Sequence, residues 1–186
     1  MRSKIIVQDR DHLKKLIEAE IKRHGDVYSL NHLDVSNITD MSHMFASSPF
    51  KGDINKWNVS RVKNTKEMFF NSIFKGNIAK WNVSSVTDMT GMFMHARFNG
   101  DISKWDVSHV KDTSRMFWNS DYKKDLTNWC PYKLEIKDNM FNDGANNHPY
   151  WYTAHNTQKA IKSYQLKNQL ETQLASSDIA PKKIKI

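Results

Sequence analysis

The chain has 186 residues, of which 39% are hydrophobic and 11% aromatic, enough for one domain with a real core. Its formal net charge of +8 favours acidic partners: an acidic protein, nucleic acid or an anionic membrane. A single cysteine, Cys130, excludes an intramolecular disulfide, and no apolar run is long enough for a membrane span or a secretory signal. We therefore expect a cytoplasmic protein.

The first expected element is a helix over residues 9–24, which Gly25 ends. Its apolar residues fall on one face at helical spacing: Leu13, Leu16, Ile17 and Ile21. A stack of repeats exposes apolar side chains and unpaired backbone at its ends, so we expect residues 1–32 to form an N-terminal cap. A partner-binding role for this face is the alternative.

From residue 33 the chain repeats itself every 24 residues. Each unit opens on Leu33 or a tryptophan and closes twelve residues later on a phenylalanine. The aligned halves are LDVSNITDMSHMF (33–45), WNVSRVKNTKEMF (57–69), WNVSSVTDMTGMF (81–93), WDVSHVKDTSRMF (105–117) and a decayed copy, WCPYKLEIKDNMF (129–141). A unit this short cannot bury its apolar face alone, so the units must stack on one another.

Each unit is expected to contain a short strand and a short helix. Alternating apolar residues such as Trp57 and Val59 favour a strand, and the next stretch favours one or two helical turns capped by residues such as Asp40 or Asp88. The glycine that precedes each following unit is expected to take a positive φ where the chain turns back: Gly52, Gly76 and Gly100. Residues 33–145 are thus predicted to form an α/β repeat solenoid, a leucine-rich-repeat-like stack of five units with helical caps at both ends.

Equivalent aromatic and methionine side chains should form ladders in the core of this stack. The fifth unit is degenerate, because Pro131 replaces the strand valine and cannot donate a ladder hydrogen bond. We expect it to be a frayed end. The C-terminal region, residues 146–186, is expected to hold an aromatic cap at Tyr150, Trp151 and Tyr152, a helix from Thr157 to about Ala175, and a flexible basic tail. The helix either caps the stack or reaches a partner.

The units WNVSSVTDMTGMF and WDVSHVKDTSRMF, with the connector FNGDISKW, resemble the BspA-like leucine-rich-repeat family, also described as the 26-residue lipoprotein repeat. The resemblance covers residues 33 to about 141. It implies a repeat scaffold that binds other macromolecules, and the better known members are bacterial surface proteins. This chain shows no lipoprotein or secretory signal, so a surface adhesin of this type is an alternative function.

Two sets of outward positions are candidate partner-binding residues. The column that follows each closing phenylalanine carries large apolar groups, which would form anchors on a rigid surface: Phe70, Met94 and Trp118. An inward orientation of this column stays open. The second set is cationic, and a solvated surface without a partner is its alternative: Lys56, Lys80, Lys104, Arg61, Lys63, His109 and Lys111.

No catalytic, metal or cofactor motif accompanies these columns. The histidines lack paired metal spacing, the single cysteine has no Cys/His set around it, and no phosphate-binding loop is present. The leading hypothesis is a non-catalytic protein–protein interaction module for an intracellular macromolecule, and an inhibitor carried by a phage or mobile element would fit its size. Nucleic-acid binding through the lysine columns is the main alternative.

Overall fold

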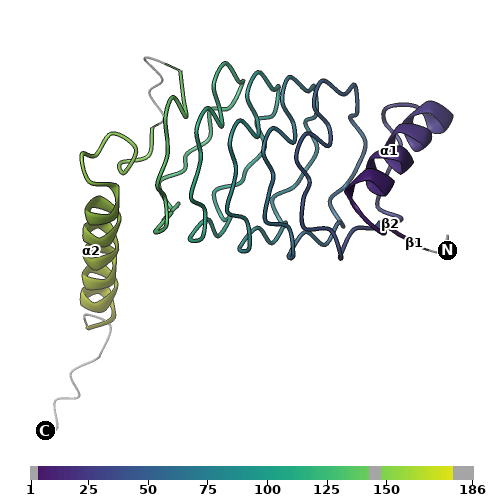
Figure 1. The fold of residues 1–186 in the computed structure, drawn as a ribbon. Coiled ribbons are helices and arrows are strands. Elements are labelled where there is room, and N and C mark those ends of the chain that lie inside the picture. The colour runs from purple at the N-terminus through teal and green to yellow at the C-terminus, as the bar shows by residue number, and fades with distance from the viewer. Residues whose placement is uncertain (1–3, 143–147, 178–186) are drawn as a thin grey trace, which may run out of the picture.

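The computed structural model describes residues 4–142 and 148–177, with side chains to residue 174. This part of the chain has two helices and two short strands: β1 (Ile5–Ile6), α1 (Arg10–His24), β2 (Leu33–Asp34) and α2 (Thr157–Ser177). Between the helices the repeat units lie side by side as a row of irregular loops (Figure 1). The basic tail predicted at the C-terminus lies outside the described residues.

The predicted α/β repeat solenoid is wrong. Where each unit was expected to hold a strand and a helix, the described residues between β2 and α2 form turns, bends and single-residue bridges. The predicted strands fail because their N–H groups bond locally: Val62 donates to the Val59 carbonyl at 2.9 Å. Only one residue of each unit pairs in parallel with the next unit: Asp40, Asn64, Asp88, Asp112 and Ile136.

The predicted helical turns are replaced by a turn segment that follows each bridge: residues 41–48, 65–72, 89–96 and 113–120. Within each segment alternate N–H groups cross to the next unit, as Phe69 does to the Met92 carbonyl at 2.9 Å. These amides cannot join the i to i−4 bonds of a helix. The segments also contain non-glycine residues with φ between 49° and 57°: His43, Ser47, Glu67, Asn71, His95, Arg115 and Asn119.

Three Asx turns shape the corners of each of the first four units, and their side chains accept the N–H two residues ahead. They occupy three columns: Asp34, Asn58, Asn82 and Asp106; Asp40, Asn64, Asp88 and Asp112; and Asp53, Asn77, Asp101 and Asp125. Asp40 and Asp88 therefore form turns, and their predicted role as helix caps is wrong. Hydrogen bonds from Ser108 lower the pKa of the Asp106 carboxyl.

Aromatic ladders form the core, as predicted. The Trp57 and Trp81 rings stack with centroids 6.4 Å apart, and both side chains are at most 5% exposed. Each indole N–H also donates to a carbonyl 27 residues earlier, so Trp57 bonds to Leu30 at 2.9 Å. Equivalent bonds of 3.0–3.2 Å run through the stack from Trp81, Trp105 and Trp129. Ring stacking and these hydrogen bonds therefore both connect successive layers of the stack.

The glycines between units serve close packing. Gly52, Gly76 and Gly100 have no positive φ, so the conformation predicted for them is wrong. A Cβ atom on Gly52 would lie 2.0 Å from the Tyr28 carbonyl oxygen, and one on Gly100 would lie 2.7 Å from the Phe98 ring. Glycine is therefore required at these positions because there is no space for a side chain.

Helix α1 covers the end of the stack at which the chain enters (Figure 1). The Asp9 side chain caps it by accepting the His12 N–H at 2.8 Å, and it ends at Gly25, where φ is 87°. Leu13 and Ile17 are buried, which confirms the predicted helix and its apolar face. The Arg10 guanidinium donates to the Ser42 carbonyl at 2.8 Å and fixes α1 to the first unit.

The opposite end is closed by the fifth unit and the residues before α2. Trp151 is fully buried, and the Tyr152 ring meets Phe141 edge-on at 5.3 Å, as expected for an aromatic cap. The Lys137 ammonium donates to the carbonyls of Trp151, Tyr152 and Ala154, and burial lowers the pKa of this amine. The fifth unit is therefore part of the stack. The first turns of α2 pack here, and its later part extends away (Figure 1).

The glycine contacts predict unequal costs for one substitution. Gly52→Ala should destabilise the fold by about 3 kcal/mol or more, because its methyl group meets fixed backbone. Gly100→Ala should cost less, about 1–2 kcal/mol, because its methyl group meets side-chain atoms of Phe98 and no backbone atom. Urea unfolding with unchanged m-values measures both changes. Equal losses for the two variants would contradict the contact made by Gly52.

Candidate functional site

The turn segments build a surface that repeats once per unit. The residue after each buried phenylalanine is partly exposed, and these residues form what we call the apolar row: Ala46, Phe70, Met94 and Trp118. The sequence left open whether this column points inward or outward. The structure gives an intermediate answer, since each side chain is half-buried and presents one side to solvent.

Backbone hydrogen bonds hold the apolar row in place on both sides. The carbonyls of Phe70 and Met94 accept the N–H groups of Ser47 and Asn71 in the preceding unit, at 2.7 and 2.8 Å. The Phe70 N–H bonds to the Glu67 carbonyl at 3.0 Å within its own segment. The backbone beneath the row is thus ordered without a ligand, which lowers the entropy that binding would cost.

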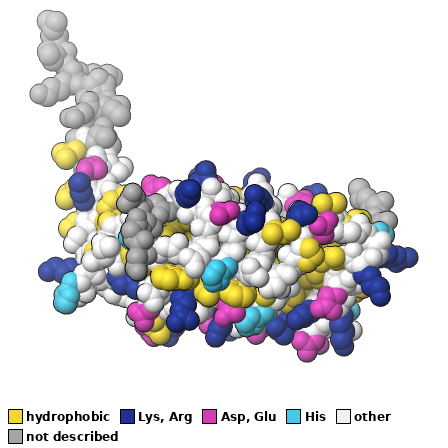
Figure 2. All heavy atoms as spheres, turned by 90° about the horizontal axis from the view of Figure 1, so that it is seen from above, with side chains coloured by type: hydrophobic (Ala, Val, Ile, Leu, Met, Phe, Trp, Pro, Cys, Tyr) yellow, Lys and Arg dark blue, Asp and Glu magenta, His cyan; other side chains and the backbone are white. Residues whose placement is uncertain are grey.

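A polar border accompanies the row. The Asn71 amide donates to the Ser47 hydroxyl at 3.2 Å, and the His95 ring meets the Phe70 ring edge-on at 5.8 Å. His43 precedes the row residue Ala46 by three positions, and its Nδ1 lies 3.3 Å from a Glu67 carboxylate oxygen. Figure 2 shows hydrophobic side chains and histidines exposed along one side of the stack, between charged side chains. This mixture suits a protein interface with an apolar centre.

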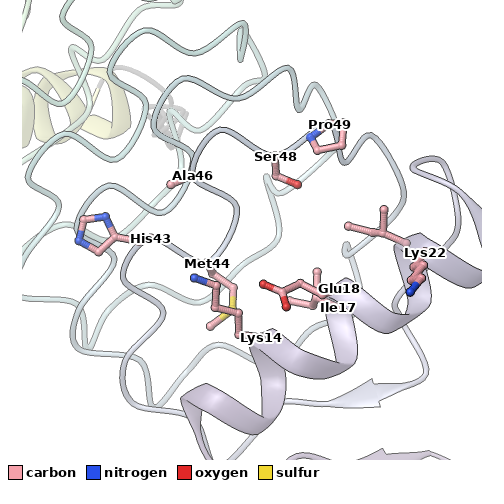
Figure 3. A pocket seen from close by; sticks show the side chains of 10 residues that line it. Lys14, Ile17, Glu18, Lys22, His43, Met44, Ala46, Ser48 and Pro49 are labelled. Atoms are coloured by element: carbon pink, nitrogen blue, oxygen red, sulfur yellow. The ribbon is translucent and has the colours of Figure 1, made fainter.

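At Ala46 the row opens into a cleft of about 330 Å³ between α1 and the first unit. Figure 3 shows side chains of α1 facing those of the first unit across this space. Its apolar lining includes Ile17, Ile21, Met44, Ala46 and Pro49, and its polar lining includes Lys14, Glu18, Lys22, His43 and Ser48. Because Ala46 belongs to both features, the cleft and the apolar row are continuous.

The cationic candidates are all exposed but come from other parts of the unit. Lys56, Lys80 and Lys104 each precede a buried tryptophan, whereas the apolar row follows a buried phenylalanine. The other set lies between the tryptophan and the bridge: Arg61, Lys63, His109 and Lys111. Three of these four have side-chain partners: Arg61 donates to Asn37 at 3.2 Å, Lys111 pairs with Glu135 at 3.2 Å, and His109 Nδ1 lies 3.2 Å from the Ser108 hydroxyl. A binding role for either set stays a prediction.

Little in the described residues supports chemistry. They contain no group of three or more His, Cys, Asp or Glu side chains that could hold a metal ion. Burial raises the pKa of the Cys130 thiol, which disfavours the nucleophilic thiolate, and its Sγ lies 3.6 Å from the Asn128 carbonyl oxygen. Neither described helix is both long and apolar enough to cross a bilayer.

The cleft is the part of this site that the sequence did not indicate. Column alignment identifies Phe70, Met94 and Trp118, but the cleft arises where α1 meets the first unit, and no periodicity relates these two elements. One signal was present in the sequence: the row begins with the small residue Ala46, where the later units carry Phe70, Met94 and Trp118.

Comparison with known proteins corrects the family assignment. A family model described as "Mycoplasma protein of unknown function, DUF285" matches residues 17–96 and 48–153. The predicted membership of the BspA-like leucine-rich-repeat family is therefore wrong, and in the described residues the units after the first also lack the strand expected of a leucine-rich repeat. No curated protein and no solved structure matches the chain.

Tryptophan fluorescence can test the exposure of the apolar row. Trp118 is half-buried, whereas the other five tryptophans are at most 5% exposed. Acrylamide should therefore quench one accessible component in the wild-type protein, and Trp118→Phe should remove that component. A quenchable component of unchanged size in Trp118→Phe would mean that the row is covered.

Proposed function

The chain belongs to the DUF285 family, and we propose that it is a non-catalytic interaction module that binds a protein partner along the apolar row. The observation that carries this proposal is the half-buried row Phe70, Met94 and Trp118 on an ordered backbone. Aromatic residues and methionine are enriched in the centres of protein interfaces, and tryptophan is among the commonest energetic hot spots.

The fold supports binding at this position because outward side chains vary while the interior repeats. Phenylalanine recurs at the buried position before the row, with rings 5.4–5.8 Å apart in the first four units. The outward neighbour changes from Ala46 to Phe70, Met94 and Trp118. One backbone thus presents a different apolar group in each unit, as expected of a recognition surface. The net charge of +8 favours a partner with an acidic surface.

Nucleic-acid binding is the second candidate function, and one observation favours it. Lys56, Lys80 and Lys104 are exposed at equivalent positions of successive units, and none pairs with a carboxylate in the part of the chain that the structure describes. Acidic residues accompany this column, however, since Asp53 and Asp101 lie three residues before Lys56 and Lys104. The apolar row has no role in this alternative.

Two triple variants separate these functions. The first variant combines Phe70→Ser, Met94→Ser and Trp118→Ser. It should capture native protein partners, fixed by cross-linking, at least tenfold less than wild type does, because the apolar anchors are lost. Lys56→Gln, Lys80→Gln and Lys104→Gln together are the matched control and should retain them. Capture from a lysate of the source organism, quantified by mass spectrometry, measures both.

The opposite pattern would contradict the proposal. Loss of binding only in the lysine variant, with affinity falling steeply as salt rises, would indicate nucleic acid instead. Each serine change can also destabilise the fold by about 1 kcal/mol, so thermal unfolding must show that the variant is folded at the assay temperature. The three single variants, which destabilise less, provide the same test if the triple variant unfolds.

A further inference from the structure

We infer that the partner segment on the apolar row is an acidic amphipathic α-helix that runs along the stack. This inference rests on the proposed function of the row and adds the shape and the charge of its ligand. Three observations carry it: the spacing of the units, the hydrogen bonding of the turn segments, and the charges around the cleft.

The spacing of the row matches the pitch of a helix. Row residues directly follow the stacked phenylalanines, whose centroids are 5.4, 5.6 and 5.8 Å apart from Phe45 to Phe117. An α-helix advances about 5.4 Å per turn, so three turns stay within about 1 Å of three units. An extended strand repeats a face about every 6.7 Å and would be out of register by about 3 Å. A helix can thus place one apolar residue against each unit.

The hydrogen bonds of the turn segments also favour a helix. Every N–H group from His43 to Ser48 bonds to a carbonyl, either within the unit or in the next one, and the same holds for residues 67–72 and 91–96. An extended peptide gains affinity by pairing its backbone with free groups of its receptor, and these segments have no free N–H to offer. A helix satisfies its own backbone and needs only side-chain contacts.

The charges around the cleft select an acidic helix. Lys14 and Lys22 line the cleft with Glu18 between them, and both lysines are exposed. Glu18 is the only carboxylate among the described residues that line the cleft, and the nearby Glu67 carboxylate lies 3.3 Å from His43. Further along the stack the exposed Arg115 precedes Trp118 by three residues. A helix with apolar residues on one face and Asp or Glu beside them complements this surface.

A second copy of this chain is the competing occupant. The later part of α2 exposes leucines four residues apart, with Leu166 58% and Leu170 51% exposed. Their spacing would suit the row, but α2 carries Lys159, Lys162 and Lys167 against the single acid Glu171. Its basic character does not complement the basic cleft.

Two display libraries test the inference on the full-length protein. One library presents 18-residue helices with leucines at positions 3, 7, 10 and 14, and the other presents 18-residue peptides with leucines at alternate positions; all remaining positions are random. The helical library should yield binders enriched in Asp and Glu. Synthetic peptides of the enriched sequences should bind Met94→Ser and Ala46→Trp at least tenfold more weakly, as measured by fluorescence anisotropy. Lys80→Gln should bind like wild type.

Several results would overturn the inference. These are enrichment only from the alternating library, no binder from either library, binders rich in Lys or Arg, and a wild-type dimer in sedimentation that Met94→Ser dissociates. The native-partner capture with the row variant is independent of these libraries. If that capture depends on the row while the helical library fails, the proposed function holds and the helical ligand does not. If both fail, the apolar row is not a binding site.

Discussion

The hydrogen bonds that cross between neighbouring turn segments are the constraint on which the structure depends. In each segment one amide in two donates to the next unit, as Phe45 does to Met68 at 2.8 Å, and the intervening amides close turns within the unit. This division leaves no N–H for a helix or for a long strand ladder. The inter-unit hydrogen bonds also set the distance between units. The stacked aromatic side chains in the core and the apolar row on the surface both repeat at this distance.

Much of this arrangement could be predicted from the repeat. The 24-residue period places Trp57 above Trp81 and Phe45 above Phe69, and the spacing in α1 identifies Leu13 and Ile17 as buried. The form of each unit could not be predicted in this way. A two-residue or helical spacing of apolar residues shows which side chains are buried, but it does not fix the backbone conformation. Turns stabilised by Asx side chains bury the same residues without forming a strand or a helix.

The backbone conformation of individual residues could not be predicted from the sequence either. Positive φ occurs at Glu67, a residue type that seldom adopts it, and does not occur at Gly52, where it was expected. The inter-unit bonds compensate for the cost of the left-handed conformation at Glu67, which donates its N–H to Thr90 at 2.8 Å. The apolar row could be found by alignment because it shares the period of the core. The cleft depends on α1, which lies outside the repeat.

Native-state hydrogen exchange of the Ser47, Asn71 and His95 amides tests most directly whether inter-unit bonds hold the apolar row. These amides donate to the carbonyls of the row at 2.7–2.9 Å. They should exchange only through opening of the stack, with protection factors of about 10⁴ or more, although their side chains are exposed. Exchange at the rate of an unfolded peptide would mean that the turn segments do not bond across units, and that the row has no fixed backbone beneath it.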